Sequence, residues 1–457
     1  MPDLRAPAAV RRVTEKLEAA GFETWAVGGA VRDALGVLGP DTRGSGGDDS
    51  DWDLATAARP ADVRRLFRRT VPLGVEHGTV GVLDRDGSML EVTTFRLDVE
   101  TTGRHAVVRF ADSIEDDLSR RDFTVNAIAW HPVRDEVLDP FGGRADLAAR
   151  VLRTVGEPAE RFAEDYLRIL RALRFAGRFG LSIERGTWEA LVSSRASVAA
   201  LSAERVREEL TKVLRHRRPS GALSLYAASR VLEVVVAPLA DLVALEEELG
   251  PDALPWTETL LSVDHVPVSL PSLRLAALFA RTGLPEARTR DLRGAWRFTG
   301  HEAAAARITR AALRGLRYSN AEIERVGDLV GLQDDLFPPD SDGPRVRRWL
   351  ARVGPARMRD LFRLHAARLR AACVRPSGAP PFDDLVTRWR MARMTWASRP
   401  PLSVGDLAVD GGDLIDLGLT PGPEFGAILE ELLELVLEDP DANDAERLRA
   451  LLRERLP

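Results

Sequence analysis

Asp51-Trp52-Asp53-Leu54-Ala55-Thr56 is a short strand-forming segment that carries two acidic residues. Alternate side chains of a strand face the same side of a sheet, so we expect the carboxylates of Asp51 and Asp53 to lie side by side. A third carboxylate, Glu91, lies in a predicted strand over residues 89–96 and can join them from a neighbouring strand. Such carboxylates can hold two Mg²⁺ ions about 3.5–4 Å apart for phosphoryl transfer. The Asp-x-Asp pattern by itself also occurs in turns and on solvent-facing strands.

A glycine pair lies upstream, in Val27-Gly28-Gly29-Ala30-Val31-Arg32-Asp33, between a predicted strand over residues 23–28 and a predicted helix. Paired glycines let a ligand approach the backbone closely, and amides at the start of a helix favour an anion such as a triphosphate. Arg32 adds positive charge. A tight strand-to-helix connection is the simpler interpretation of the glycines alone, but their combination with the carboxylate strand favours phosphate chemistry.

Two further polar segments can contact a nucleotide. Residues 120–126 carry groups that hydrogen-bond a sugar or a phosphate, and residues 164–168 are predicted to be helical. Asp165 and Arg168 would share a face of that helix. Such a pair is usually a surface salt bridge, although an acceptor and a donor held together also match the Watson–Crick edge of a base. The candidate nucleotide-binding residues here and in the following helical stretch are Arg121, Asp122, Asn126, Asp165, Arg168, Arg171 and Arg174.

The composition is that of a globular protein with several domains. The 457 residues carry a net charge of −6, so overall charge does not indicate a nucleic-acid binder. Cys373 is the only cysteine, which excludes a disulfide framework or a thiolate zinc site within the chain. All basic residues except Lys16 and Lys212 are arginines, which suits bidentate phosphate contacts but also follows from genomic base composition. The sequence has no membrane-spanning run and begins without a secretory signal, so we predict a cytoplasmic protein.

The order of the motifs resembles that of the class II tRNA nucleotidyltransferase and bacterial poly(A) polymerase family. The segments that carry this resemblance are Val27-Gly28-Gly29-Ala30-Val31-Arg32-Asp33, Asp51-Trp52-Asp53, Arg120-Arg121-Asp122-Phe123-Thr124, Asp139-Pro140-Phe141-Gly142-Gly143, Glu164-Asp165-Tyr166-Leu167-Arg168 and Ser202-Ala203-Glu204-Arg205. The resemblance implies that Asp51 and Asp53 are the metal-binding catalytic carboxylates. It also implies triphosphate contacts by Gly28, Gly29 and Arg32, ribose contacts by Arg121 and Asp122, and selection of CTP or ATP by Asp165 and Arg168.

The resemblance also implies an α+β fold with a small mixed-sheet head followed by helical domains. We expect a catalytic nucleotidyltransferase head over residues 1–145, a helical neck with the base-selecting motif over 146–220, a helical body over 221–335, and a helical tail over 336–457 that contacts tRNA. Within the head, residues 4–20 are predicted to form an amphipathic helix and residues 79–83 a further strand. Residues 36–50, rich in Gly and Asp, are predicted to be a mobile surface insertion.

The implied activity is Mg²⁺-dependent addition of CC or CCA to the 3′ end of tRNA, held by its acceptor arm, from CTP and ATP. Family members that complete CCA usually carry, after a Thr-Thr-Phe-Arg strand, a flexible loop of the type Asp-Gly-x-Tyr-x-Asp-x-Arg-Arg-Pro. Residues 97–110 are about two residues shorter than that pattern and lack its Tyr, Arg-Arg and Pro. We therefore hypothesise that the enzyme stops at CC, with full CCA addition as the alternative. An A-adding enzyme or poly(A) polymerase also stays open, whereas the intact carboxylates disfavour a non-catalytic RNA-binding protein.

The body segments over residues 272–283 and 300–302 resemble an HD phosphohydrolase domain. The His-Asp pair of that domain has become Ala280-Arg281 in this chain. His301 remains, but a single histidine without partner ligands is more often a surface or packing residue than a metal ligand. We therefore predict that this region has no metal-dependent phosphohydrolase activity and serves packing and RNA support.

Overall fold

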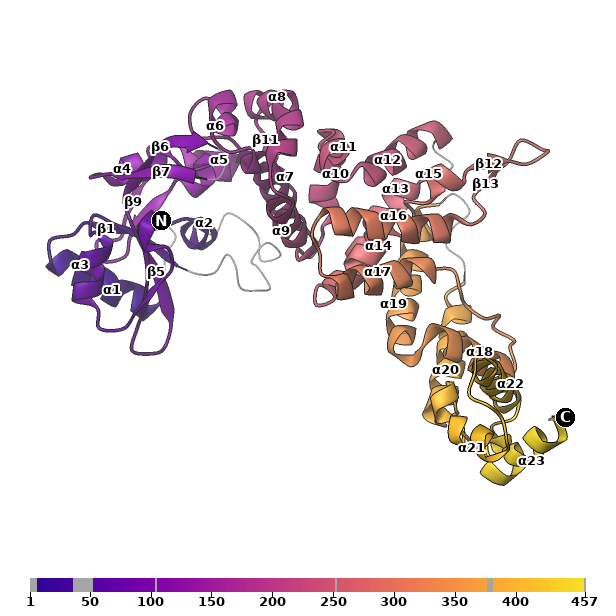
Figure 1. Ribbon diagram of the computed structural model, residues 1–457. Helices are drawn as coiled ribbons and strands as arrows, with labels where there is room; N and C mark the ends of the chain where they lie inside the picture. The colour runs from indigo at the N-terminus through magenta and orange to yellow at the C-terminus, as the bar shows by residue number, and fades with distance from the viewer. Residues whose placement is uncertain (1–5, 36–51, 103–104, 251–252, 376–380, 456–457) are drawn as a thin grey trace. The chain divides into compact units, whose positions relative to one another are not determined.

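The computed structural model describes residues 6–35, 52–102, 105–250, 253–375 and 381–455 (Figure 1). The chain divides into two compact units. The first is Met1–Ala240 with Gly315–Arg317, and the second is Asp241–Arg314 with Tyr318–Pro457. The predicted insertion over residues 36–50 and the carboxylate of Asp51 lie outside the described residues.

A seven-stranded mixed sheet forms the centre of the first unit. Its strands, in spatial order, are β3 (Thr70–Pro72), β4 (Thr79–Leu83), β5 (Met89–Thr94), β2 (Asp53–Thr56), β1 (Thr24–Val27), β8 (Ala129–His131) and β9 (Glu136–Leu138). Strands β2 and β5 pair in parallel, and the other neighbours are antiparallel. The predicted small mixed sheet is thus confirmed, and β2 is its central strand. Leu54, Ala55 and Thr56 of β2 are buried, as expected for a strand covered on both faces.

Short helices surround this sheet. Helix α1 (Ala8–Ala19), within the predicted amphipathic segment, buries Val10, Val13 and Leu17 and contacts β1 and β2. The other helices near the sheet are α2 (Gly29–Ala34), α3 (Pro60–Leu66), α4 (Ile114–Ser119) and α5 (Gly143–Ala149). In the region where the family pattern has a flexible loop, two strands pair in antiparallel, β6 (Arg96–Thr102) and β7 (His105–Phe110). Their β-branched content favours strands.

From residue 151 onward the first unit is helical apart from a pair of short strands, β10 (Val151–Leu152) and β11 (Ser182–Ile183). Its helices are α6 (Pro158–Glu164), α7 (Leu167–Phe179), α8 (Arg185–Ser194), α9 (Ala203–Leu214), α10 (Ser220–Ala228), α11 (Leu232–Val235) and α12 (Ala237–Leu249), the last of which continues into the second unit. Helix α7 packs closely on α10 at Gly177, where a Cβ atom would lie 2.2 Å from the backbone nitrogen of Ala222. Only glycine permits this approach.

The described part of the second unit is helical, as predicted for the body and tail, with one two-stranded hairpin of β12 (Thr289–Arg290) and β13 (Trp296–Arg297). Its remaining helices are α13 (Pro255–His265), α14 (Pro271–Phe279), α15 (Leu284–Ala287), α16 (His301–Gly315), α17 (Asn320–Gly331), α18 (Gly343–Val353), α19 (Pro355–Ala371), α20 (Asp383–Ala397), α21 (Gly411–Asp416), α22 (Glu424–Glu438) and α23 (Ala445–Arg455). One apolar core gathers around Trp349, Leu361 and Leu385. Among the described helices, none has the length and apolarity needed to span a membrane.

Candidate active site

Two of the three predicted catalytic carboxylates lie on adjacent strands at the centre of the sheet. Asp53, the first residue of β2, is in register with Glu91 of the parallel strand β5. Residues in register on neighbouring strands present their side chains to the same face. Asp53 is half-buried and Glu91 is exposed. Asp51 lies outside the described residues, so its place beside Asp53 stays a prediction.

Gly28 brings the glycine turn against this carboxylate. Its φ of 82° belongs to the region that favours glycine, and it directly precedes α2. A Cβ atom at this position would lie 3.5 Å from Oδ2 of Asp53 and 3.5 Å from Nη1 of Arg121. The backbone of Gly28, the Asp53 carboxylate and the Arg121 guanidinium therefore converge on one place, although 93 residues separate the first from the last in sequence.

A largely buried network of hydrogen-bonded polar side chains lies next to Gly28 and Arg121. Arg32 Nη1 donates to Oδ1 of Asn126 at 2.7 Å, and Asn126 Nδ2 donates to Oδ1 of Asp122 at 3.0 Å. Arg171 Nε then donates to the other oxygen of Asp122 at 2.7 Å. Burial opposes ionisation of Asp122, but the charge of Arg171 and the Asn126 hydrogen bond hold the pKa of that carboxyl below its usual value. The network joins four predicted nucleotide-binding residues.

Two arginine side chains in this region keep hydrogen-bonding capacity that the protein does not use. Among the described residues, the buried atoms Nη2 of Arg32 and Nε of Arg121 have no hydrogen-bond partner. Arg32 is only 1% exposed and stacks on the ring of Phe179, 4.3 Å from its centroid, so burial lowers the pKa of its guanidinium. Buried donors without partners are costly, and an anionic ligand would satisfy them.

Asp117 orients the second of these arginines. Its carboxylate lies three and four residues before two arginines at the end of α4 and accepts hydrogen bonds from Arg120 Nε at 2.9 Å and Arg121 Nη2 at 3.2 Å. Burial raises the pKa of Asp117, but the charges of Arg121 and Arg120 more than offset it and lower that pKa. Sequence analysis missed this residue. The helical spacing of Asp117 from both arginines was the available signal.

Asp165 and Arg168 do not share a helical face, contrary to the prediction. Asp165 has an extended backbone (φ −156°, ψ 106°) between α6 and α7. Its Oδ1 accepts a hydrogen bond from the backbone N–H of Leu167, the first residue of α7, at 3.0 Å. Aspartate satisfies free amides at helix starts in this way, and here it interrupts the expected helix.

The two side chains also have different partners. Arg205 Nη2 donates to Oδ2 of Asp165 at 2.6 Å, whereas Arg168 Nη1 pairs with Glu164 and donates to the carbonyl oxygen of Arg161 at 2.9 Å. Both side chains are thus held by the protein in this structure. The role of Arg205, which lies in the Ser-Ala-Glu-Arg motif, was not foreseen from the sequence.

Arg174 lies deeper than the other candidates. Its Nε donates to Oε2 of Glu209 in α9 at 2.7 Å, and the two side chains are 5% and 2% exposed. Arg174 also stacks on Phe175, with 4.3 Å between the guanidinium carbon and the ring centroid. The structure therefore gives Arg174 a partner within the helical core. Neither Glu209 nor Phe175 was singled out by sequence analysis.

Acid is expected to destabilise this unit through its buried carboxylates. The pKa values of Asp117, Asp122 and Glu209 are lowered in the fold because arginine charges outweigh their burial. A lowered folded-state pKa contributes stability that is fully present above the ordinary values of 3.8 and 4.5 and is lost as pH falls through the folded-state values. We expect the urea midpoint to fall steeply below about pH 4.5. Denaturation series should show a weaker fall for Glu209→Gln, and a midpoint independent of pH would contradict the assignment.

Two family models match the chain. Residues 24–153 match the model described as the poly A polymerase head domain. Residues 180–242 match the model described as the probable RNA and SrmB-binding site of polymerase A. The first match contains Gly28, Asp53 and Arg121, which lie together in the structure, and Glu91, which is in register with Asp53. The second match begins at the end of α7.

The chain is also similar over nearly its full length to proteins with known names. It is 32% identical to the CCA-adding enzyme of Geobacillus kaustophilus (strain HTA426), covering 97% of this chain and 96% of that protein. The crystal structure of the Bacillus stearothermophilus CCA-adding enzyme in complex with CTP superposes with a TM-score of 0.72 at 28% identity, covering 98% of each chain. The Thermotoga maritima CCA-adding enzyme complexed with tRNA has the same fold, with a TM-score of 0.57 at 18% identity over 100% of this chain and 97% of that one. The chain therefore belongs to the CCA-adding enzyme family, as its motifs predicted.

Proposed function

We propose that this protein adds the terminal nucleotides of tRNA, taking CTP and ATP and using the 3′ end of the acceptor arm as primer. The observation that carries the proposal is the convergence of Asp53, Gly28 and Arg121, with Glu91 in register with Asp53 on the neighbouring strand. Full-length similarity to CCA-adding enzymes supports the choice of substrate. A tRNA substrate is in keeping with the cytoplasmic location expected from the sequence.

Nucleotidyltransferases of this family use a divalent metal ion, and we propose Mg²⁺. Asp53 and Glu91 supply the hard oxygen ligands that Mg²⁺ prefers, and Asp51 is proposed to complete the set. The absence of a side chain at Gly28 leaves room beside Oδ2 of Asp53. When bound, the ion would activate the attacking hydroxyl and offset charge on the phosphoryl oxygens.

The protein's own residues would bind and orient the nucleotide. Arg121 Nε and Arg32 Nη2 offer unused donors to phosphate or ribose oxygens, and Gly28 and Gly29 let the triphosphate approach the backbone. The 3′ hydroxyl of the RNA forms a bond to the α-phosphorus while the bond to pyrophosphate breaks, so no covalent enzyme intermediate is needed. Asp122 and Asn126 act by holding Arg32 and Arg171 in place.

Base selection is proposed for Asp165 and Arg168, which lie within the neck. An acceptor and a donor at this point can pair with the hydrogen-bonding edge of cytosine or adenine. Because Arg205 and Glu164 hold these side chains in the structure, the base would have to replace those partners. We propose that the functional domains keep the bounds predicted from the sequence. These are the head over residues 1–145, the neck over 146–220, the body over 221–335 and the tail over 336–457.

The number of nucleotides added can be measured directly. The assay uses an end-labelled tRNA that lacks CCA, incubated with CTP and ATP. If the hairpin of β6 and β7 cannot support the change from CTP to ATP as substrate, we expect the product ending in CC to accumulate. Readily formed terminal A would instead establish full CCA addition and end the CC-only hypothesis. Incubation of tRNA ending in CC with ATP alone, beside an oligo(A) primer, separates the A-adding and poly(A) alternatives.

A further inference from the structure

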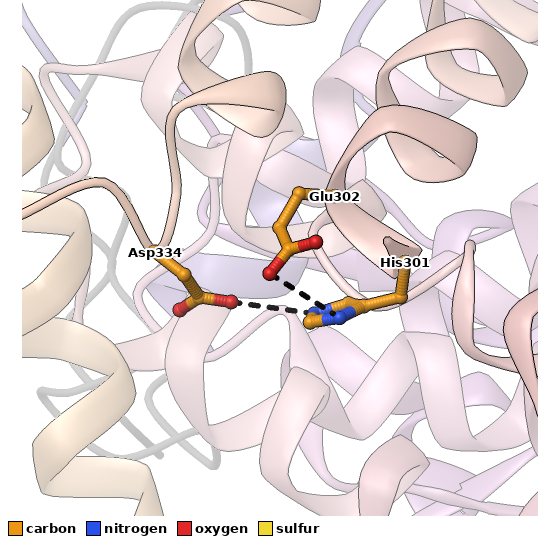
Figure 2. A group of neighbouring side chains, drawn as sticks. All are labelled: His301, Glu302 and Asp334. Atoms are coloured by element: carbon orange, nitrogen blue, oxygen red, sulfur yellow. Dashed lines mark ion pairs between the residues drawn. The ribbon is translucent and has the colours of Figure 1, made fainter. Parts of the chain in front are cut away.

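His301, Glu302 and Asp334 form a compact cluster in the second unit (Figure 2). His301 and Glu302 open α16, and Asp334 follows α17. Within the cluster, one ligand atom of each residue lies within 4.8 Å of the others. Sequence analysis treated His301 as a solitary histidine. The structure corrects this, because the fold places two carboxylates beside its ring.

The imidazole is oriented as in a metal ligand. Its Nδ1 lies 3.1 Å from the carbonyl oxygen of Phe298, which can only accept a hydrogen bond, so the proton belongs on Nδ1. The lone pair of Nε2 then points toward Asp334, whose Oδ2 is 3.3 Å away. Adjacent ligands of a tetrahedral zinc ion are separated by about 3.4 Å when each bond is about 2.1 Å. Glu302 Oε1 lies 3.5 Å from Nδ1, on the other side of the ring, and its side chain would have to rotate to bind the same ion.

Both sides of the cluster are fixed by buried contacts. A Cβ atom on Gly283 would lie 2.0 Å from the carbonyl oxygen of His301, so the turn before α15 packs directly on the start of α16. Gln333 is fully buried and donates through Nε2 to the carbonyl oxygen of Ala280 at 2.6 Å. Arg368 Nη1 donates to Oδ1 of Asp334 at 2.7 Å, which leaves Oδ2 for the cluster. Metal-binding carboxylates are commonly anchored by such a second hydrogen bond.

We propose that His301, Glu302 and Asp334 bind a divalent transition-metal ion, with Zn²⁺ as the best match. One imidazole nitrogen and two carboxylate oxygens are a zinc donor set, and a water molecule would fill the fourth position. Such an ion would tie the start of α16 to the segment after α17. We assign the ion a structural role. A hydrolytic HD centre needs further metal ligands, but here the corresponding position is Arg281, which is buried and paired with Glu258.

A competing interpretation is that a protonated His301 simply bridges two carboxylates. Zinc binding separates the two, because an imidazolium has no lone pair for the ion. The experiment uses the full chain with Asp51→Asn, Asp53→Asn and Glu91→Gln, which together remove the carboxylates proposed to bind metal in the head. After treatment with a chelator, titration calorimetry with Zn²⁺ measures stoichiometry and affinity, and Co²⁺ absorption reports the coordination geometry.

We expect one equivalent of Zn²⁺ to bind, a tetrahedral Co²⁺ spectrum, and a higher melting temperature with Zn²⁺. His301→Gln should weaken binding by more than about 100-fold, because it removes a direct ligand rather than an outer-shell partner. His265→Gln, an exposed histidine of α13, is the matched control and should change nothing. If His301→Gln fails to fold, Glu302→Gln serves as the second variant. Absence of zinc binding, or binding that survives both variants, would leave only the ion-pair interpretation.

Discussion

Asp53→Asn is expected to lower the rate of nucleotide incorporation by at least about 1000-fold while leaving the fold intact. Asparagine keeps the shape of the side chain but removes the negative charge that a divalent cation requires. Asp53 is the first residue of the central strand, in register with Glu91 and beside Gly28, and β2 has no other carboxylate among its described residues. Incorporation of labelled CTP into tRNA at saturating Mg²⁺ measures the effect.

Asp112→Asn is the matched control for this loss. Asp112 is also in the head, but its side chain is almost fully exposed, and its ion-pair partner among the residues with described positions is the exposed Arg59. Such surface pairs contribute little, so activity and melting temperature should both stay at the wild-type values. If Asp53→Asn kept most of its activity, the assignment of Asp53 as a catalytic carboxylate would be wrong. A parallel fall in melting temperature would assign it a structural role instead.

Glu209→Ala is expected to produce the largest loss of stability, about 3–5 kcal/mol in the free energy of unfolding. Its carboxylate pairs with Arg174, and both side chains are almost completely buried between α7 and α9. Removal of the carboxylate leaves a buried guanidinium with no opposite charge, whose desolvation is then uncompensated. Lys212, 3.3 Å from Glu209, adds a second positive charge to this place. Urea denaturation at neutral pH measures the change.

The double variant Arg174→Met, Glu209→Met tests the cause. Two apolar side chains of similar length remove both charges together, so most of the lost stability should return. If the double variant is as unstable as Glu209→Ala, then packing rather than charge explains the loss. Because Arg174 was also a candidate for nucleotide binding, KM for CTP in the refolded double variant shows whether it contacts the substrate as well.

Much of the head could be predicted because its signals are local. β-Branched and aromatic residues located β1, β2, β4 and β5, and the glycine pair located the turn before α2. The parallel pairing of β2 with β5, which places Glu91 beside Asp53, was only a suggestion at the sequence level. Hydrophobic alternation shows which residues face one side of a strand, but it does not choose the neighbouring strand.

The base-selecting pair shows where local reasoning failed. A spacing of three residues predicted that Asp165 and Arg168 share a helical face, but Asp165 ends one helix and caps the next. Its partner is Arg205, 40 residues away, and the partner of Arg171 is Asp122, 49 residues away. Helical periodicity cannot identify such partners, because they depend on how helices pack on one another.

The sequence by itself determined the family, the order of the motifs and the residue types available for phosphate chemistry. Tertiary structure alone decided which charges meet: Asp122 with Arg171, Arg174 with Glu209, and His301 with Asp334. The physical reason is that local backbone preference and apolar periodicity are properties of short segments. Pairing of buried charges is a property of the packed chain. Asp117 finds its arginines within one helical turn, but Asp122 and Arg174 pair with groups far away in the sequence.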